Sequence, residues 1–369
     1  MITNNDLNKQ LPNELNVIFK ELKVLQHLRN AGITKALGFS RPLKKSDCPE
    51  NENPIKTHSQ KRVILANKVV GTMLIINVFT YESGRKNFPD FQIQILSHFF
   101  SGLGFSSGYL FQLVFGLIFR NKNWFRTLES KKSHDFPAKD SVYRFMNHST
   151  FNWRKFLLNL SSYTIGKVTK LTNHQRPKVL ILDDSSYDRN RSKSVELLAR
   201  CFDHASQKMR YYKGFRLLTL GWSDGATFIP VDFSLLSSKK SQINGISPNI
   251  DKRSSGYKRR VNALQTAPEQ IPDMIHRALS SGIDASYVLM DSWFTTPPLV
   301  KNIQEQGLDV IGMVKNLKQR YLYDDQRVSL KELYTLATPT EGKKSIIRSI
   351  HTTQSNGVVV CQHKTVQLF

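Results

Sequence analysis

Lys178-Val-Leu-Ile-Leu-Asp-Asp-Ser-Ser186 is an unbroken apolar run that ends in two acids and two serines. Such a run is typical of a buried strand, and its polar end marks the point where the strand leaves the core. The stretch before it has helical periodicity, whereas the stretches after it alternate between strand and helix patterns. The sequence therefore predicts that a sheet begins here.

Further strands are predicted after this run. A turn signal, Ser223-Asp224-Gly225, joins the first two of them as a hairpin. An amphipathic helix around Met274 follows and ends before Gly282, and a second helix opens at Thr296-Pro297 and ends at Gly307. The predicted strands are Phe215–Trp222, Thr227–Ser234, Tyr287–Met290 and Asp309–Val314. This order predicts a mixed α/β sheet.

Helices are predicted upstream of the sheet. Their apolar positions recur at helical spacing over Asn13–Leu28, Tyr109–Phe119, Asp140–His148 and a run capped by Ser149 that includes Trp153 and Phe156. Arg144, Arg154 and Lys155 fall on other faces of these helices, which suits contact with a duplex and equally suits a solvated helix surface. We expect a small basic helical domain.

The balance of 53 Lys and Arg against 29 Asp and Glu gives a formal net charge of +24. This excess favours a nucleic-acid partner over an anionic membrane or a merely basic surface. The three widely spaced cysteines form neither a disulfide framework nor a zinc knuckle, which indicates a reducing cytoplasm. No secretory signal is recognisable, and glycines and serines interrupt the uncharged stretch Phe91–Phe119, so two buried helices fit it better than a membrane span.

Two acids, Asp184 and Asp291, each end an apolar strand. Carboxylates brought side by side repel each other unless a cation neutralises them, and Mg2+ or Mn2+ does so through oxygen ligands. Two such ions about 3.5–4 Å apart can activate a water or a 3′-hydroxyl and stabilise the leaving oxygen of a phosphodiester. The alternative is that each Asp simply caps a turn.

Four ordered motifs sharpen this hypothesis: Val179–Ser186, Asp203-His-Ala-Ser206, Tyr212–Gly225 and Leu289-Met-Asp-Ser-Trp-Phe294. Together they resemble the bacterial cut-and-paste insertion-sequence transposases of the DDE superfamily, specifically insertion-sequence family four. The resemblance extends over Leu110–Trp124 and Asp140–Trp153, and it covers most of the chain outside 41–106. It implies an RNase H-like catalytic core whose first two metal-binding carboxylates are Asp184, rather than Asp183, and Asp291.

The sequence departs from that family at the third carboxylate. The family has a Glu in a late helix, with Tyr seven and Arg four residues before it and Lys seven after it, and no residue here has that context. Glu332 and Glu341 stand in other contexts and are not assigned the role. We expect a β-rich insertion to start near residue 321 and the chain to be truncated before the Glu, which makes its activity doubtful.

DNA contacts are predicted from basic residues near the carboxylates and from a Ser- and Gly-containing loop over 237–260, for which a solvated flexible loop is the alternative. These residues are Arg189, Arg191, Lys193, Lys239, Lys240, Lys252, Arg253, Lys258, Arg259 and Arg260. Trp293 and Phe294 suit either base stacking or the core, and the core is favoured.

The sequence thus predicts a bacterial transposase that acts on double-stranded DNA, both transposon ends and target, at the nucleoid in the cytoplasm and away from membranes. The alternatives are a non-catalytic DNA-binding remnant and an RNase H-like nuclease without strand transfer, and homodimerisation is left open. The expected regions are an N-terminal helical segment (1–40), an unspecified insert (41–106), a helical DNA-binding domain (107–172), the catalytic core (173–320) and the start of the β-rich insertion (321–369).

Overall fold

A computed structural model describes residues 17–33, 105–119, 123–129, 136–173, 175–203, 210–339, 341, 346–354 and 359–365. Its helices are α2 (Val24–Asn30), α4 (Ser107–Phe119), α5 (Trp124–Leu128), α6 (Lys139–Asn147), α7 (Trp153–Leu171), α8 (Ser255–Asn262), α9 (Ala267–Ser280), α10 (Pro297–Gln304) and α11 (Leu330–Leu336). Its strands are β1 (Val179–Asp188), β2 (Ala199–Asp203), β3 (Arg210–Ser223), β4 (Phe228–Leu236), β5 (Tyr287–Met290), β6 (Asp309–Gly312), β7 (Arg320–Tyr323), β8 (Gln326–Ser329), β9 (Thr338–Pro339), β10 (Ile346–Thr353) and β11 (Val359–Thr365).

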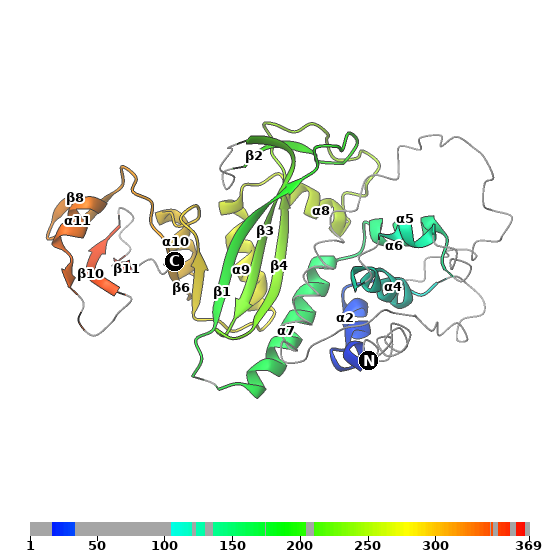
Figure 1. The fold of residues 1–369 in the computed structure, drawn as a ribbon, viewed down its shortest axis with the longest axis horizontal. Helices are drawn as coiled ribbons and strands as arrows, with labels where there is room; N and C mark the ends of the chain where they lie inside the picture. The colour runs from blue at the N-terminus through cyan, green and yellow to red at the C-terminus, as the bar shows by residue number, and fades with distance from the viewer. Residues whose placement is uncertain are drawn as a thin grey trace, which may run out of the picture.

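The main sheet is mixed, as the sequence predicts. β1 pairs antiparallel with β3, and β3 pairs antiparallel with both β2 and β4. β5 joins the other side of β1 in parallel, and β6 joins β5 in parallel. The long strands β1, β3 and β4 form the centre of the molecule in Figure 1. The predicted fold class, a mixed α/β sheet of RNase H-like organisation preceded by helices, is therefore confirmed.

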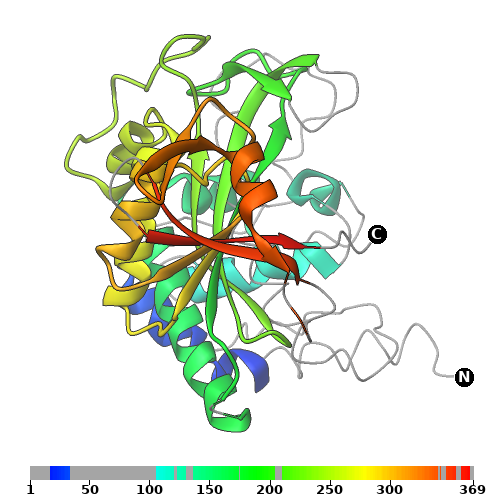
Figure 2. The same ribbon diagram turned by 90° about the vertical axis from the view of Figure 1, so that its left-hand side faces the viewer.

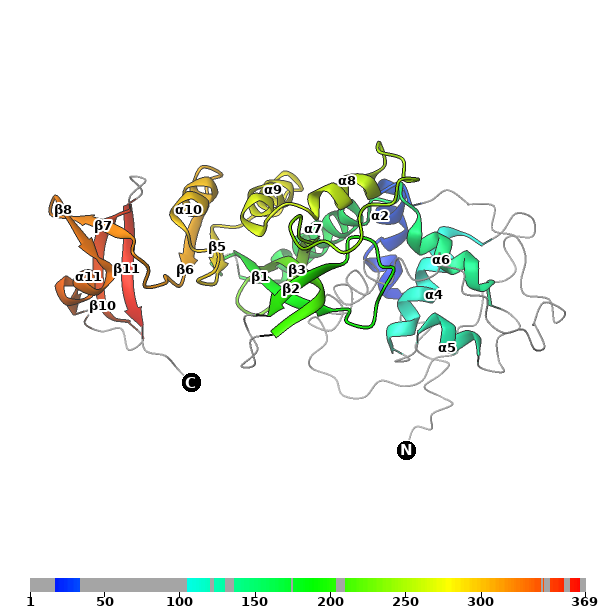
Figure 3. The same cartoon turned by 90° about the horizontal axis from the view of Figure 1, so that it is seen from above.

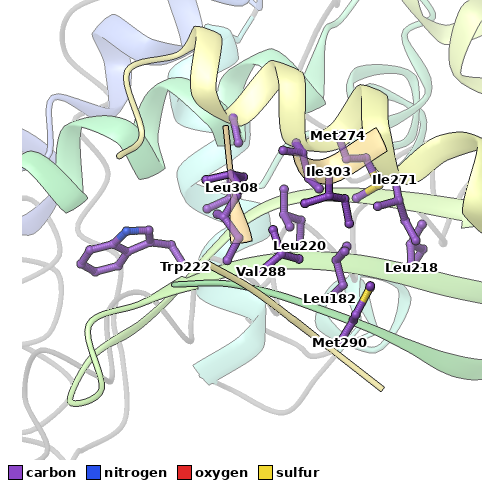
Figure 4. Packing of buried hydrophobic residues seen from close by; sticks show 14 of the residues in the cluster. Leu182, Leu218, Leu220, Trp222, Ile271, Met274, Val288, Met290, Ile303 and Leu308 are labelled. Carbon is purple, nitrogen blue, oxygen red and sulfur yellow. The ribbon is translucent and has the colours of Figure 1, made fainter. Parts of the chain in front are cut away.

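One face of this sheet forms the core. Because strand side chains alternate between faces, Leu180 and Leu182 of β1 share a face with Leu218 and Leu220 of β3. These four side chains are almost fully buried and pack with residues of α9, α10 and β5 (Figure 4). Figure 3 shows α8, α9 and α10 in a row along one side of the strands. The next residue of β1 on this face is Asp184, so the face changes there from apolar to charged.

A second core lies among the helices before the sheet. It contains buried residues of α2, α4, α6 and α7, with several aromatic pairs around Trp153 and Phe156. Helix α7 also contributes Leu158, Ile165 and Val168 to the core of the sheet. The helices form a layer of their own beside β4 and add no strand to the sheet (Figure 1).

The predicted ends of these helices needed correction. Asn152, not Ser149, caps α7, because its side-chain oxygen accepts a hydrogen bond from the Lys155 backbone N–H at 3.0 Å. The first helix is interrupted at Lys23, which has φ of 49°, and it resumes as α2 until Asn30. Residues 13–16 and the expected insert up to residue 104 lie outside the described residues.

A buried charge network fixes α7 and α9 to β4. The Asp232 side chain on β4 is 0% exposed, and its carboxylate lies 3.2 Å from Arg154 Nε and 2.8 Å from Arg277 Nη2. Arg154 also donates a hydrogen bond to the Phe233 carbonyl oxygen at 3.2 Å. Arg154 therefore faces the protein interior, and its predicted place on a solvated or DNA-facing helix surface was wrong. The apolar spacing of α7 alone did not reveal its buried partner.

A separate sheet follows β6. Its strands run in the order β11-β10-β7-β8, and β9 pairs with β10. Leu333 of helix α11 packs in a small core with Tyr321 of β7 and Ile350 of β10. This sheet lies at one end of the molecule and is nearest the viewer in Figure 2. Within the described ranges, no helix is long and apolar enough to cross a membrane.

Candidate active site

Asp184 lies where the apolar face of β1 ends. Its side chain is 15% exposed and forms an ion pair with Arg216 of β3, which is 36% exposed. Burial raises the pKa of the Asp184 carboxyl, the Arg216 guanidinium lowers it, and the carboxylates of Asp183 and Asp291 raise it further. The net pKa shift is upward, so this carboxylate is costly to ionise without cations.

Asp291 follows β5 directly. The parallel pairing of β1 with β5 ends at Leu182 and Met290, so the next residues of both segments lie at the same end of this pairing, although β1 itself continues to Asp188. Asp291 Oδ1 accepts a hydrogen bond from the Trp293 backbone N–H at 2.8 Å, and its backbone oxygen accepts from Thr295 Oγ1 at 2.8 Å. The turn after β5 therefore fixes the carboxylate. Asp291 caps this turn, as the alternative interpretation expected, and it also interacts electrostatically with Asp184.

Two aromatic residues in the turn after Asp291 have opposite environments. Phe294 is 2% exposed and belongs to the core, as predicted, whereas Trp293 is 47% exposed. The core interpretation of Trp293 was therefore wrong. Lys315, three residues beyond β6, lies over the Trp293 ring with its Nζ 3.4 Å from the ring centroid. Because β6 is the parallel neighbour of β5, the chain after β6 brings a cation to the same edge as Asp291.

Further polar groups continue the Asp184 face toward the end of β1. Arg216 pairs with Ser186 in the β1–β3 register, two positions beyond the Asp184–Leu218 pair. The Tyr212 hydroxyl donates a hydrogen bond to the Phe215 carbonyl oxygen at 3.0 Å and lies beside Ser186 and Cys201. Burial is the main cause that raises the pKa of Tyr212 to about 12. This phenol therefore stays neutral at physiological pH.

A third carboxylate does not join this pair within the described part of the chain. Those residues contain no group of three or more His, Cys, Asp or Glu side chains that could hold a metal ion. Glu332 lies in α11 beside the other sheet, where it takes part in the N-terminal capping box of that helix and lies 3.3 Å from Arg320. Glu341 is exposed. The absence of the family's Glu stays a prediction from the sequence.

Comparison with known proteins identifies the superfamily of this chain. A family model described as DDE superfamily endonuclease matches residues 121–354, which is more than half of the chain. The chain belongs to the DDE endonuclease superfamily. Sequence comparison with curated proteins gives no match. The family match spans the mixed sheet and includes both Asp184 and Asp291.

Two solved transposase structures are similar to this DDE superfamily chain at low identity. One is the Drosophila P element transposase strand transfer complex, at 9% identity and a TM-score of 0.22 over 87% of this chain. The other is a piggyBac transposase synaptic complex with hairpin DNA, at 13% identity and a TM-score of 0.25 over 89% of this chain. The alignments span 57% and 55% of those longer chains. At such TM-scores the likenesses add nothing to the family match.

The predicted DNA-contacting residues fall into two groups in this endonuclease-superfamily chain. Most are exposed, whereas Arg259 donates a hydrogen bond to the Phe151 carbonyl oxygen at 3.0 Å and Arg260 forms an ion pair with Glu196 at 2.8 Å. Arg189 lies against the ring of Tyr187, and Arg253 lies 3.3 Å from Asp251 while remaining 92% exposed. The exposed members are Arg191, Lys193, Lys239, Lys240, Lys252, Arg253 and Lys258.

The segment 237–260 is irregular up to Ser254, and its end is helical. Its last residues begin helix α8, whose N-cap is Ser254, and the Gly256 backbone N–H donates to the Ser149 carbonyl oxygen at 2.7 Å. Arg259 and Arg260 therefore hold α8 against its neighbours. Their assignment as phosphate contacts stays a prediction, and these internal contacts argue against it. Short helices in basic, serine-rich stretches leave little signal in a hydrophobic pattern.

Sequence reasoning missed Arg216 and Lys315 as members of the site. Arg216 had a detectable signal, because it occupies the same alternating register as Leu218 and Leu220, where a buried strand face should be apolar. Lys315 had none, because its place depends on the parallel pairing of β5 with β6.

Proposed function

We propose that this DDE superfamily chain is a transposase of the insertion-sequence family-four kind, which cleaves DNA phosphodiesters and joins the ends to a target. The observation that carries the proposal is the parallel pairing of β1 with β5, which ends at Leu182 and Met290, because Asp184 lies two residues and Asp291 one residue beyond that pair. Both carboxylates are partly buried, and the Asp291 charge raises the electrostatic cost of ionising Asp184. The family-four motifs around both residues support the finer assignment.

The residues at this edge fit a hard divalent cation such as Mg2+ or Mn2+. The fit rests on the donor set, two carboxylates with a net upward pKa shift at Asp184 that positive charge would relieve. Asp184 and Asp291 would hold the ions, which would activate water or a 3′-hydroxyl and stabilise the leaving oxygen. The approach of the two carboxylates to metal-bridging distance is part of this proposal.

The chain's own residues would supply positioning and charge. The Asp291 carboxylate is held by the Trp293 backbone N–H, and Phe294 anchors the same turn in the core. Such support limits movement of the carboxylate, which matters because in-line chemistry is sensitive to small displacements. Exposed lysines and arginines, within a net charge of +24, would neutralise DNA phosphates at any sequence.

A second candidate is a DNA-binding protein that does not cut. It is favoured by the observation that, across the residues that the structure describes, no third metal-binding side chain joins Asp184 and Asp291. A nuclease that cuts without joining is the remaining alternative. All three would act on DNA, and in our proposal they would do so at the nucleoid of a bacterial cytoplasm.

The test is nicking of supercoiled plasmid DNA with Mn2+, followed by capture of a labelled 3′-hydroxyl oligonucleotide. We expect any nicking and capture by the wild type to fall to background levels with Asp184→Asn or Asp291→Asn, because either loss removes an ion ligand. Asp188→Asn is the matched control, since Asp188 lies on the same strand with a side chain 46% exposed.

The outcomes separate the candidates. Nicking without capture would favour the nuclease, and tight DNA binding without nicking would favour the non-catalytic protein. Nicking that survives both active-site substitutions would refute the assignment of Asp184 and Asp291. DNA affinity, measured by fluorescence anisotropy in EDTA, should not fall below that of the wild type in any of these variants.

A further inference from the structure

Arg216 forms an ion pair with Asp184 at the position where a divalent ion would bind this carboxylate. Arg216 Nη2 contacts Asp184 Oδ2, the carboxylate that the proposed function assigns to divalent ions. The contact joins neighbouring strands on one face of the sheet, because Arg216 lies two residues before Leu218, the β3 partner of Asp184. A divalent cation at this oxygen would compete with the guanidinium, because two positive charges at one carboxylate repel each other.

A purely structural role for the pair is a weak explanation. β1 and β3 already pair over ten consecutive residues, from Val179 with Ser223 to Asp188 with Gly214. The two strands therefore need no side-chain ion pair to stay together. The Arg216 side chain is also 36% exposed, and solvent screening weakens the contribution of such a pair to stability.

Charge balance gives the pair a more specific meaning. Asp183 precedes Asp184 in β1, and Asp291 follows the parallel neighbour β5, so Asp184 lies among other carboxylates. Within the described residues, Arg216 is the cation that pairs with Asp184. It therefore supplies, in the absence of ions, part of the positive charge that the carboxylates require.

The chemistry of the guanidinium indicates where it goes when an ion binds. Its planar, always charged fork matches the oxygens of a phosphate, and its long, flexible side chain gives it reach from β3. A DNA strand at the Asp184–Asp291 edge would bring a phosphate beside it. Arg216 would then exchange one anionic partner for another.

We propose that Arg216 is a built-in counter-cation of Asp184 that a divalent ion must displace and that then binds a DNA phosphate. This inference rests on the proposed function, because it takes Asp184 as an ion ligand. Arg216 thereby makes ion binding and DNA binding cooperative, since DNA offers the displaced guanidinium a new partner. Ion binding without DNA leaves that charge uncompensated, which disfavours a loaded site before the substrate arrives.

The first experiment measures ion affinity in Arg216→Gln without DNA. Tb3+ luminescence sensitised by tryptophan is a suitable signal, because Trp293 lies two residues from Asp291, and Mn2+ competition then gives the affinity of the natural type of ion. We expect about tenfold tighter binding of either ion to Arg216→Gln, because a competing charge at the carboxylate is gone. Arg210→Gln is the matched control, since Arg210 lies on the same strand and is 3.9 Å from Asp188; its ion affinity should equal that of the wild type.

The second experiment measures DNA affinity by anisotropy with Ca2+ and with EDTA. In Arg216→Gln the increase in DNA affinity caused by Ca2+ should shrink by about tenfold, because the displaced guanidinium no longer contributes a charge-assisted hydrogen bond. Arg216→Lys keeps the charge without the planar fork, so it should give intermediate values in both experiments. Because Arg216→Lys keeps a positive charge beside Asp184, it can be measured in place of Arg216→Gln if that variant does not fold.

The outcomes distinguish this inference from the proposed function. Suppose that Asp184→Asn abolishes the ion binding seen in the wild type. Unchanged or weaker ion binding in both Arg216 variants would then overturn the role of Arg216 and leave the proposed function intact. Ion binding that Asp184→Asn and Asp291→Asn leave unchanged would overturn both. Tighter ion binding with a smaller Ca2+ effect on DNA affinity would support the coupling.

Discussion

Asp232→Asn tests whether the buried charge network holds the helical layer to the sheet. The substitution keeps the side-chain volume but removes the charge that Arg154 and Arg277 share. It also turns one acceptor oxygen into an N–H donor that faces a guanidinium. Because the Asp232 side chain is 0% exposed, water cannot replace the missing partner, and removing one member of a buried pair costs about 3–5 kcal/mol.

The assay is urea unfolding followed by far-UV circular dichroism and by tryptophan fluorescence. Asp284→Asn is the control, because Asp284 is 73% exposed and pairs with Lys178 at 2.6 Å, an arrangement worth about 0–1 kcal/mol. The double variant Asp232→Asn with Arg277→Met should lose less stability than the sum of the two single variants, because no arginine at position 277 is then left without its partner. A loss below about 1 kcal/mol for Asp232→Asn would show that the network is not stabilising, and our reasoning about it would be wrong.

Two further predictions concern DNA binding and pH. Replacing the exposed lysines Lys239, Lys240, Lys252 and Lys258 by Gln should weaken binding to all duplex sequences alike and lower the slope of log affinity against log salt by about 0.9 for each DNA phosphate that is no longer neutralised. A salt slope equal to that of the wild type would show that this surface is not part of the DNA interface. The matched control replaces four other exposed lysines, Lys20, Lys170, Lys301 and Lys331, and should leave the slope unchanged. The pKa of Tyr212 is raised from 10.0 to about 12, chiefly by burial, so the folded protein retains a proton that the unfolded chain releases, and stability should fall as pH rises through that window. Tyr212→Phe should flatten this fall in urea unfolding at alkaline pH, and an unchanged pH dependence would contradict the buried state of the phenol.

The sequence was most informative where a hydrophobic period was long and local. The sequence predicted the strand at Val179, the helix around Met274, and the glycines Gly282 and Gly307 that end the later helices. In the structure these two glycines have φ of 77° and 82°. Local patterns also placed Asp291 directly after a strand, but the predicted strand end at Asp184 was wrong, because β1 continues to Asp188 by pairing with β3. These features depend on neighbours within a few residues, which a linear sequence displays directly.

Features that depend on pairing between distant segments were missed. β2 was not predicted, because its five residues owe their structure to antiparallel pairing with β3. The buried position of Arg154 depends on Asp232, which is 78 residues away (232 − 154) and on a strand that reads as apolar. Likewise, Trp293 was placed in the core with Phe294, although the turn after β5 directs only Phe294 inward.

Helix α7 has a practical consequence, because its two faces complete two different cores. Its Trp153 and Phe156 side chains belong to the helical cluster, while Ile165 and Val168 belong to the cluster under the sheet. A fragment cut at the end of this helix would leave an apolar strip of β4 in water, and a fragment cut before it would leave the helices without a central member. We therefore expect the two regions to unfold in one transition, because the loss of α7 would expose apolar surface in both.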